Sequence, residues 1–221
     1  MNNTLILTGG DLRPDFVKNY MKDKQFDIII AVDGGLTVAD RADIKPNYII
    51  GDFDTVSPLL LYKYEKMEDV DIIRYRPDKD TTDTGLAIDK AIEINSFSIH
   101  ILGATGSRFD HTLSNILLLQ PASKAGIDAI IVNENNRIRL LGDKRKNIQL
   151  TKKENIYKYV SIIPLTEKVT GITTKGMKYN VNNYDFYIDK EISMGVSNEI
   201  EDDVAEISII NGKLLLVESN D

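Results

Sequence analysis

Apolar residues in the first two thirds of the chain come in short, uninterrupted runs that alternate with stretches of helical periodicity. Runs rich in Ile, Leu and Val are typical of strands that are buried on both faces. The amphipathic stretches between them, two of which open at Pro14 and Pro58, predict helices. This alternation predicts a parallel sheet covered by helices, which is a three-layer α/β domain. The predicted strands are residues 4–8, 26–32, 48–50, 71–75, 98–102 and 129–132, with a seventh run at 137–141.

The pattern changes after about residue 142, where the helical periodicity disappears. Short strand-like runs separated by polar turns follow, and Asn211-Gly212 between the last two runs is a strong signal for a β-hairpin. We therefore predict an N-terminal α/β domain at residues 1–142 and a small all-β sandwich domain at residues 143–221. The predicted strands of the second domain are residues 159–163, 169–172, 184–188, 205–210 and 213–217.

The composition narrows the class of protein. With 221 residues, 42% of them hydrophobic, the chain can bury a core in one large domain or two small ones. No apolar run approaches the length of a membrane span, and the N-terminus lacks the pattern of a secretory signal. The net charge of −7 argues against sequence-independent nucleic-acid binding, and the absence of Cys excludes disulfides and thiolate metal sites. These features favour a cytoplasmic protein that binds neither membranes nor nucleic acid.

Acidic residues directly follow the predicted strand at residues 48–50. In Gly51-Asp52-Phe53-Asp54-Thr55 the two Asp are two positions apart, so in an extended chain their carboxylates point the same way, roughly 6–7 Å apart. A cation relieves the repulsion within such a pair, and Mg²⁺ prefers oxygen ligands. The alternative interpretation is a solvated loop with an Asx turn.

Two further acidic segments follow strand ends. Asp33-Gly34-Gly35 comes directly after one buried run, and Asp80-Thr81-Thr82-Asp83 leads from another into a helix. Ligands of parallel α/β sheets bind at the carboxyl ends of the strands, so we expect these carboxylates to gather at one edge. The alternatives are a tight turn for the first segment and, for the second, a capping box with Asp83 at the third helical position.

The segment from Gly103 to Asp110 joins a predicted strand to a predicted helix. Glycine-rich turns at such a junction present backbone N–H groups to phosphate, and Arg108 can hold phosphate oxygens through two hydrogen bonds. The spacing matches neither the P-loop nor the dinucleotide-binding fingerprint. The alternative is an ordinary connecting loop with Asp110 as the N-cap. No Ser/His/Asp nucleophile set is evident, which favours phosphoryl transfer.

Several short segments together form an ordered set of motifs. In the first half they are Asp33-Gly34-Gly35, Gly51-Asp52-Phe53-Asp54, Lys79-Asp80-x-x-Asp83 and Gly103-x-x-Gly106-x-Arg108-x-Asp110-His111. In the second half they are Gly171-Ile172, Gly176-Met177-x-Tyr179 and Gly195-Val196-Ser197-Asn198-Glu199. In order and spacing, this set resembles the motifs of the thiamine pyrophosphokinase family. The resemblance implies transfer of a pyrophosphoryl group from ATP to the hydroxyethyl oxygen of thiamine, giving thiamine diphosphate and AMP.

The resemblance also implies roles for individual residues. Mg²⁺ would be held by Asp52, Asp54 and Asp83, with Asp33 and Asp80 in support. The triphosphate of ATP would meet Lys79 and Arg108, and the nucleotide pocket would be shaped by Asp110 and Asn115. The aminopyrimidine of thiamine, bound between the subunits of a homodimer, would meet Ser197 and Asn198. Catalysis would depend on Asp54, Asp83 and Arg108, with one of the two aspartates accepting the alcohol proton.

Two features depart from the family pattern. Thr105 and Ser107 stand where many relatives have bulkier apolar and glycine residues, so the contacts of this loop are open. The chain has no Trp, so any aromatic stacking on thiamine must come from a Tyr or Phe such as Tyr179.

Three other functions remain open from the residues alone. Asp52-Phe53-Asp54-Thr55-Val56 after an apolar strand also fits the nucleophile motif of haloacid-dehalogenase-type phosphatases, in which Asp52 would form an aspartyl-phosphate. A pyrophosphokinase acting on another alcohol, such as a pterin, is a second alternative. A non-catalytic sensor of thiamine or nucleotide is the third. A phosphatase would release inorganic phosphate. A pyrophosphokinase would release AMP, and only when an acceptor alcohol is present.

Overall fold

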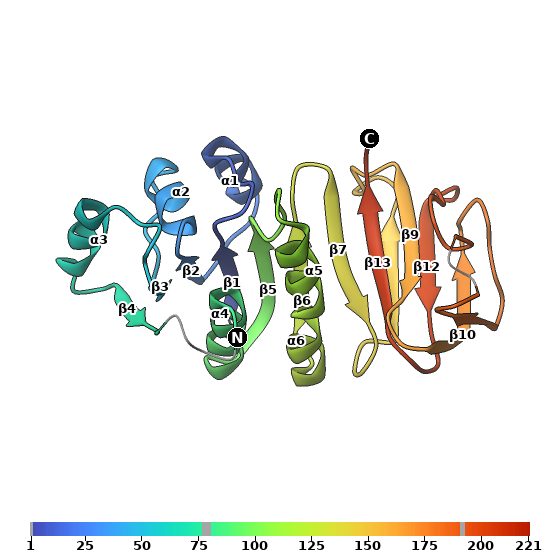
Figure 1. Ribbon diagram of the computed structural model, residues 1–221. Helices are drawn as coiled ribbons and strands as arrows, with labels where there is room; N and C mark the ends of the chain where they lie inside the picture. Colours follow the sequence, from blue (N-terminus) through green and yellow to red (C-terminus); the bar gives the residue numbers. More distant parts are fainter. Residues whose placement is uncertain (1, 77–80, 191–192) are drawn as a thin grey trace. The chain divides into compact units, whose positions relative to one another are not determined.

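The computed structural model describes residues 2–76, 81–190 and 193–221, and the chain forms two compact units (Figure 1). The units are residues 1–134 and 135–221. Every helix in the described part of the chain belongs to the first unit, and the described part of the second unit is built from strands and turns. In the described part of the chain, no helix is long and apolar enough to cross a membrane.

The strands of the first unit lie in the order β4-β3-β2-β1-β5-β6, and each neighbouring pair is parallel. Parallel neighbours require crossover connections, and the helices supply them. The strands are β1 (Asn2–Leu7), β2 (Ile28–Val32), β3 (Tyr48–Gly51), β4 (Asp71–Arg74), β5 (Ser96–Leu102) and β6 (Asp128–Val132). The helices are α1 (Pro14–Met21), α2 (Gly35–Arg41), α3 (Pro58–Glu65), α4 (Asp83–Glu93), α5 (Phe109–Leu117) and α6 (Leu119–Ala125).

Helices cover both faces of this sheet. Leu5 and Leu7 of β1 lie in one apolar cluster with Val17 of α1 and Ala39 of α2. Ile6 between them is also fully buried, and it points to the opposite face, where α4 contacts β1. The burial of successive residues on opposite faces confirms the predicted three-layer α/β arrangement.

The second unit contains two groups of antiparallel strands. One has the order β7-β13-β9 and the other β11-β10-β12-β8. Their inward side chains share one apolar core, in which Leu216 of the first group lies with Phe186 and Ile207 of the second. This confirms the predicted β-sandwich. The strands are β7 (Asn136–Leu141), β8 (Asn147–Thr151), β9 (Tyr159–Pro164), β10 (Lys168–Lys175), β11 (Tyr184–Tyr187), β12 (Val204–Ser208) and β13 (Leu214–Ser219).

Two details of the second unit differ from the sequence expectation. The run at residues 137–141, assigned above to the first domain, is β7, which pairs with β13 at the end of the chain, so the contact boundary falls at 134/135 instead of 142/143. The predicted hairpin at Asn211-Gly212 is wrong, because β12 pairs with β10 and β8 whereas β13 pairs with β7 and β9. The turn takes the chain from one sheet to the other, with Gly212 at φ +92°.

Candidate active site

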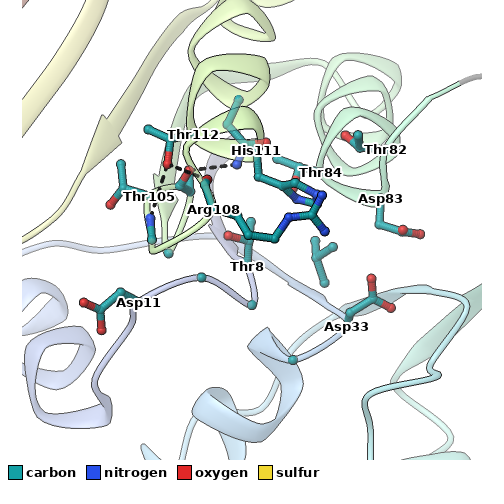
Figure 2. Close-up of a pocket in the computed structure, with 18 of the residues that line it drawn as sticks. Thr8, Asp11, Asp33, Thr82, Asp83, Thr84, Thr105, Arg108, His111 and Thr112 are labelled. Atoms are coloured by element: carbon teal, nitrogen blue, oxygen red, sulfur yellow. Dashed lines mark hydrogen bonds between the residues drawn. The ribbon is translucent and has the colours of Figure 1, made fainter.

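A pocket of about 730 Å³ opens in the first unit where β1, β2, β3 and β5 end (Figure 2). Its lining includes Asp33 and Asp54 from the loops after β2 and β3, Asp83 at the start of α4, and Arg108 in the loop after β5. These residues come from four separate segments of the chain. The parallel sheet brings them together because it ends these strands at one edge.

Asp33 is held by the loop that follows β3. Its backbone adopts the left-handed conformation at φ 43°, and its Oδ1 accepts a hydrogen bond from the Phe53 backbone N–H at 3.3 Å. A Cβ at Gly51 would lie 1.8 Å from Asp33 Oδ1, so only glycine permits this approach. The Asx turn considered from the sequence is present, because Asp52 Oδ1 accepts from the Asp54 N–H at 3.2 Å. The turn does not exclude the site, since Asp54 still lines the pocket.

The start of α4 corrects one sequence interpretation. Thr82 is the N-cap, and its side chain accepts a hydrogen bond from the Gly85 N–H at 3.2 Å. Asp83 is therefore the first helical residue instead of the third, and the predicted capping box is wrong. This position leaves the Asp83 carboxylate at the pocket. Lys79 and Asp80, both proposed to act here, lie outside the described residues.

The carboxylates of this edge influence one another. Burial, together with the charges of Asp83 and Asp52, raises the pKa of Asp33 from 3.8 to about 6. Hydrogen bonding to Asp83 raises it further, whereas the Phe53 N–H lowers it. The three carboxylates are thus close enough for a bound cation to relieve their mutual repulsion.

We expect Asp33→Asn to stabilise the ligand-free protein above pH 6. The raised pKa of Asp33 means that the folded state keeps a proton between pH 4 and 6 that the unfolded state loses, so wild-type stability falls across this window and the deficit is complete above it. Asn keeps the acceptor for Phe53 and tolerates the left-handed backbone. With solvent screening, the midpoint of thermal unfolding in a chelating buffer should rise by about 2–4 °C at pH 8 and not at pH 4. Equal unfolding midpoints of wild type and Asp33→Asn at pH 8 would contradict the repulsion of Asp33 by Asp83 and Asp52.

The loop between β5 and α5 forms the other wall of the pocket. Asn115, which is buried in α5, donates from Nδ2 to the Ala104 carbonyl at 2.7 Å. Thr112 Oγ1 accepts from the Gly106 N–H at 3.3 Å. Arg108 occupies the N-cap position of α5, so the alternative in which Asp110 is the N-cap is wrong. Both Arg108 and Asp110 are exposed, and Arg108 Nη2 donates to Asp110 Oδ2 at 2.7 Å.

The structure also brings residues to this pocket that the sequence did not single out. Thr8, Gly9, Gly10 and Asp11 line it from the end of β1. His111, the last residue of the motif that begins at Gly103, lines it from the first turn of α5. From the sequence alone, Gly9 and Gly10 indicate only the end of the predicted strand at residues 4–8. Their position directly after a predicted strand is the signal in the sequence, but only the sheet order shows that β1 lies between β2 and β5.

A second, smaller pocket of about 300 Å³ lies within the second unit. Ile162, Met177 and Phe186 give it an apolar wall, and Tyr179 and Asn198 also line it. Asn198 accepts from the Tyr179 N–H at 3.0 Å and donates to the Tyr179 carbonyl at 2.7 Å. Its amide therefore fixes the backbone of an aromatic residue that is 67% exposed.

Ser197 differs from its neighbour Asn198 in its surroundings. Its backbone is left-handed at φ 60°, and its N–H donates to Ser161 Oγ at 3.0 Å. Ser197 is not among the residues that line this pocket in the described part of the chain.

Comparisons with known proteins agree on one family. The family model "Thiamin pyrophosphokinase, catalytic domain" matches residues 17–131, and "Thiamin pyrophosphokinase, vitamin B1 binding domain" matches residues 145–214. The chain is 33% identical over 192 residues to the thiamine pyrophosphokinase of Bacillus subtilis, covering 87% of each chain. This chain belongs to the thiamine pyrophosphokinase family.

Solved structures of thiamine pyrophosphokinases have the same fold over the whole chain. The Bacillus subtilis structure has a TM-score of 0.86 at 31% identity and covers 99% of this chain and 100% of its own. The Geobacillus thermodenitrificans structure has a TM-score of 0.82 at 26% identity, covering 99% and 97%. The two family models match separate segments, one in each unit. Most residues that line the first pocket lie within the catalytic-domain match, and all those that line the second lie within the vitamin B1-binding match.

Proposed function

We propose that this protein transfers the pyrophosphoryl group of ATP to the hydroxyethyl oxygen of thiamine, releasing AMP and thiamine diphosphate. The observation that carries the proposal is the first pocket, in which Asp33, Asp54 and Asp83 lie around the same cavity as Arg108. Phosphoryl transfer needs this combination of carboxylates for a cation and a cationic side chain for phosphate oxygens. Membership in the thiamine pyrophosphokinase family supports the choice of thiamine over a pterin, and of transfer over hydrolysis.

Asp52, Asp54 and Asp83 would hold Mg²⁺, with Asp33 in support. Within residues 2–76, 81–190 and 193–221, no preformed group of three acidic or histidine side chains is arranged as a metal site. The support comes from Asp33, whose pKa is raised by burial and by Asp83 and Asp52. Oxygen ligands alone suit Mg²⁺, which when bound would neutralise phosphate charge and orient the β-phosphorus for attack.

The protein side chains would act on both sides of the transferred group. Arg108, after leaving Asp110 for the phosphate, would stabilise charge on the equatorial oxygens of the transition state. Asp54 or Asp83 would accept the proton of the thiamine alcohol as it attacks the β-phosphorus and AMP leaves. Asn115 holds the Ala104 carbonyl and so keeps the loop that carries Arg108 in place. Lys79 and Asp80 keep the roles that the family resemblance implies, and Asp110 would help to shape the pocket by holding Arg108 through their ion pair until ATP binds.

Thiamine would bind in the second unit, with Tyr179 stacking on its aminopyrimidine and Ser197 and Asn198 beside it. We expect Tyr179→Ala to raise KM for thiamine about tenfold, because it removes an aromatic contact from the pocket wall. Tyr179→Phe keeps the ring and should stay within about twofold of wild type. Initial rates at varied thiamine and saturating ATP measure both. A parallel rise in KM for ATP, or an equal effect of the Phe variant, would remove stacking by Tyr179 from the proposal.

A homodimer with thiamine between its subunits, and a cytoplasmic location, complete the proposal. Both rest on the family resemblance and on composition. Sedimentation of the purified chain at micromolar concentration tests the dimer, and a monomer that is active at that concentration would exclude it.

The decisive experiment is incubation with ATP, Mg²⁺ and thiamine, with products separated by chromatography. Thiamine diphosphate and AMP should appear in equal amounts, and AMP should not form without thiamine. Inorganic phosphate release from ATP or phosphate esters would favour the phosphatase alternative. AMP formation only with another alcohol would favour a different acceptor, and ligand binding without turnover would favour the sensor.

A further inference from the structure

The pocket of the first unit has two chemically different ends. Figure 2 shows Asp33 and Asp83 on one side of it, Asp11 and Thr105 on the other, and Thr8 and Arg108 between them. The sheet order gives the same separation, because Asp33 follows β2 and Thr105 follows β5, with β1 between these strands. The end with Asp11 and Thr105 has no role in the proposed chemistry.

Asp11 and Thr105 are held next to each other by the backbone. The Asp11 N–H donates to the Thr105 carbonyl at 2.8 Å, and the Gly10 N–H donates to the Gly103 carbonyl at 3.0 Å. These bonds join the loop after β1 to the loop after β5. The Asp11 side chain is exposed at the rim of the pocket, and the Thr105 side chain is half-buried in its wall.

The Thr105 hydroxyl is held by a hydrogen bond from a residue outside the pocket. Asn133, the first residue after β6, donates from Nδ2 to Thr105 Oγ1 at 2.9 Å. Since the Thr105 oxygen accepts this bond, its own proton is available for donation to another acceptor. Asn133 itself is not among the described residues that line the pocket. Its neighbour Glu134 pairs with Arg13, with Arg13 Nη2 2.7 Å from Glu134 Oε1, so the ends of β1, β5 and β6 are tied together.

We propose that Asp11 and Thr105 form the ribose-binding end of the nucleotide pocket and that Asn133 is the positioning residue for Thr105. A ribose hydroxyl can accept a hydrogen bond from Thr105 and donate one to the Asp11 carboxylate. This completes a chain in which Asn133, Thr105, the ribose hydroxyl and Asp11 each bond to the next, and such chains strengthen their members. The proposal rests on the proposed function, because the triphosphate lies between Arg108 and the opposite carboxylates and so directs the nucleoside to this end.

The assignment to ribose instead of phosphate follows from charge. A carboxylate such as Asp11 repels phosphate oxygens but accepts hydrogen bonds from sugar hydroxyls, as acidic residues do in dinucleotide-binding sites. The neutral hydroxyl of Thr105 beside it can also hydrogen-bond to the two ribose hydroxyls. The pocket volume of about 730 Å³ is in the range of nucleotide-sized sites.

The test compares the affinity for ATP with that for 2′-deoxy-ATP and 3′-deoxy-ATP, measured calorimetrically with Mg²⁺ and without thiamine. Wild type should bind ATP about tenfold more tightly than at least one deoxy analogue. Asp11→Ala and Thr105→Val should each reduce this ratio to within about twofold, mainly by weakening the binding of ATP. The phosphates of the analogues are identical, so the ratio is unaffected by the charge that Asp11→Ala removes.

Further variants test the roles of the Thr105 hydroxyl and of Asn133 and control for the change of charge. Thr105→Ser keeps the hydroxyl and should keep the discrimination. Asn133→Ala should reduce the discrimination in wild type but change nothing further in the Thr105→Val background, since it acts through that hydroxyl. Asp15→Ala removes the same charge from α1 away from the pocket and should leave the ratio at its wild-type value. Thr105→Ala replaces Thr105→Val if the latter does not fold.

Equal binding of ATP and both deoxy analogues by wild type, or full discrimination in Asp11→Ala, would overturn the ribose assignment. Additive effects of the Asn133 and Thr105 variants would overturn the positioning role of Asn133. A wild type that binds ATP but forms no thiamine diphosphate would overturn the proposed reaction and leave the ribose result standing. A wild type that binds no ATP would overturn both.

Discussion

Asp54→Asn should lower kcat by at least about 100-fold at saturating ATP and thiamine, because it removes a full negative charge from the proposed cation site. The substitution is nearly isosteric, so the fold should be retained. Asp54 lines the pocket that Asp33 and Asp83 also line. An amide oxygen still coordinates Mg²⁺ but no longer balances its charge, so the variant should also require more Mg²⁺ for half-maximal rate.

A matched variant separates this effect from a general change of charge. Asp89 lies on α4, six positions beyond Asp83, and is exposed, so Asp89→Asn should stay near wild-type turnover. Turnover of each variant is measured by AMP release across a Mg²⁺ titration. Near-normal turnover of Asp54→Asn would remove Asp54 from the mechanism, and normal turnover restored by high Mg²⁺ would restrict its role to metal affinity.

Gly10→Ala should abolish tight ATP binding and destabilise the first unit. A Cβ at Gly10 would lie 2.1 Å from the Gly103 carbonyl oxygen and 2.5 Å from that of Thr105. Both contacts are with backbone, so the loops after β1 and β5 must separate, and the bond from the Gly10 N–H to Gly103 would break. We expect a loss of about 2–3 kcal/mol in the free energy of unfolding and a weakening of ATP binding by at least about tenfold.

Gly106→Ala is the matched control for this change. It adds the same methyl to the same wall, but its Cβ would meet the Asp11 nitrogen at 3.2 Å, which a small shift relieves. Denaturant unfolding and calorimetry should therefore show a much smaller effect for Gly106→Ala. Equal effects of the two substitutions, or none for Gly10→Ala, would show that the close approach of the two loops does not shape the pocket.

The α/β layers were predictable because burial on both faces leaves a visible mark in the sequence. Successive residues of a strand such as Leu5-Ile6-Leu7 are all buried and all apolar, whereas a helix at the surface keeps a polar face. The identity of strand partners leaves no such mark. The apolar run at residues 137–141 predicts a strand, but its pairing partner β13 lies far along the chain, near the C-terminus.

The candidate site was predictable to the extent that it consists of charged residues after strand ends. Asp33, Asp54, Asp83 and Arg108 were all selected on that basis, and the structure places them around one pocket. Thr105 and Asn133 could not be selected in the same way. A neutral hydroxyl and an amide are common in loops, and only their distance of 2.9 Å gives them meaning.

The sequence by itself determined the class of fold, the division into a helical and an all-β part, and the loops that carry charge. These features follow from local patterns of apolar and polar residues, because the free energy of burial acts on each strand and helix wherever it lies. The tertiary structure decided which loops meet. Strand order placed β1 between β2 and β5, so Gly9, Gly10 and Asp11 joined the pocket. The fold also buried Asp33 and placed it near Asp83, and both effects raise the pKa of Asp33. Such contacts depend on the distance between atoms from separate loops, which no single segment of the sequence encodes.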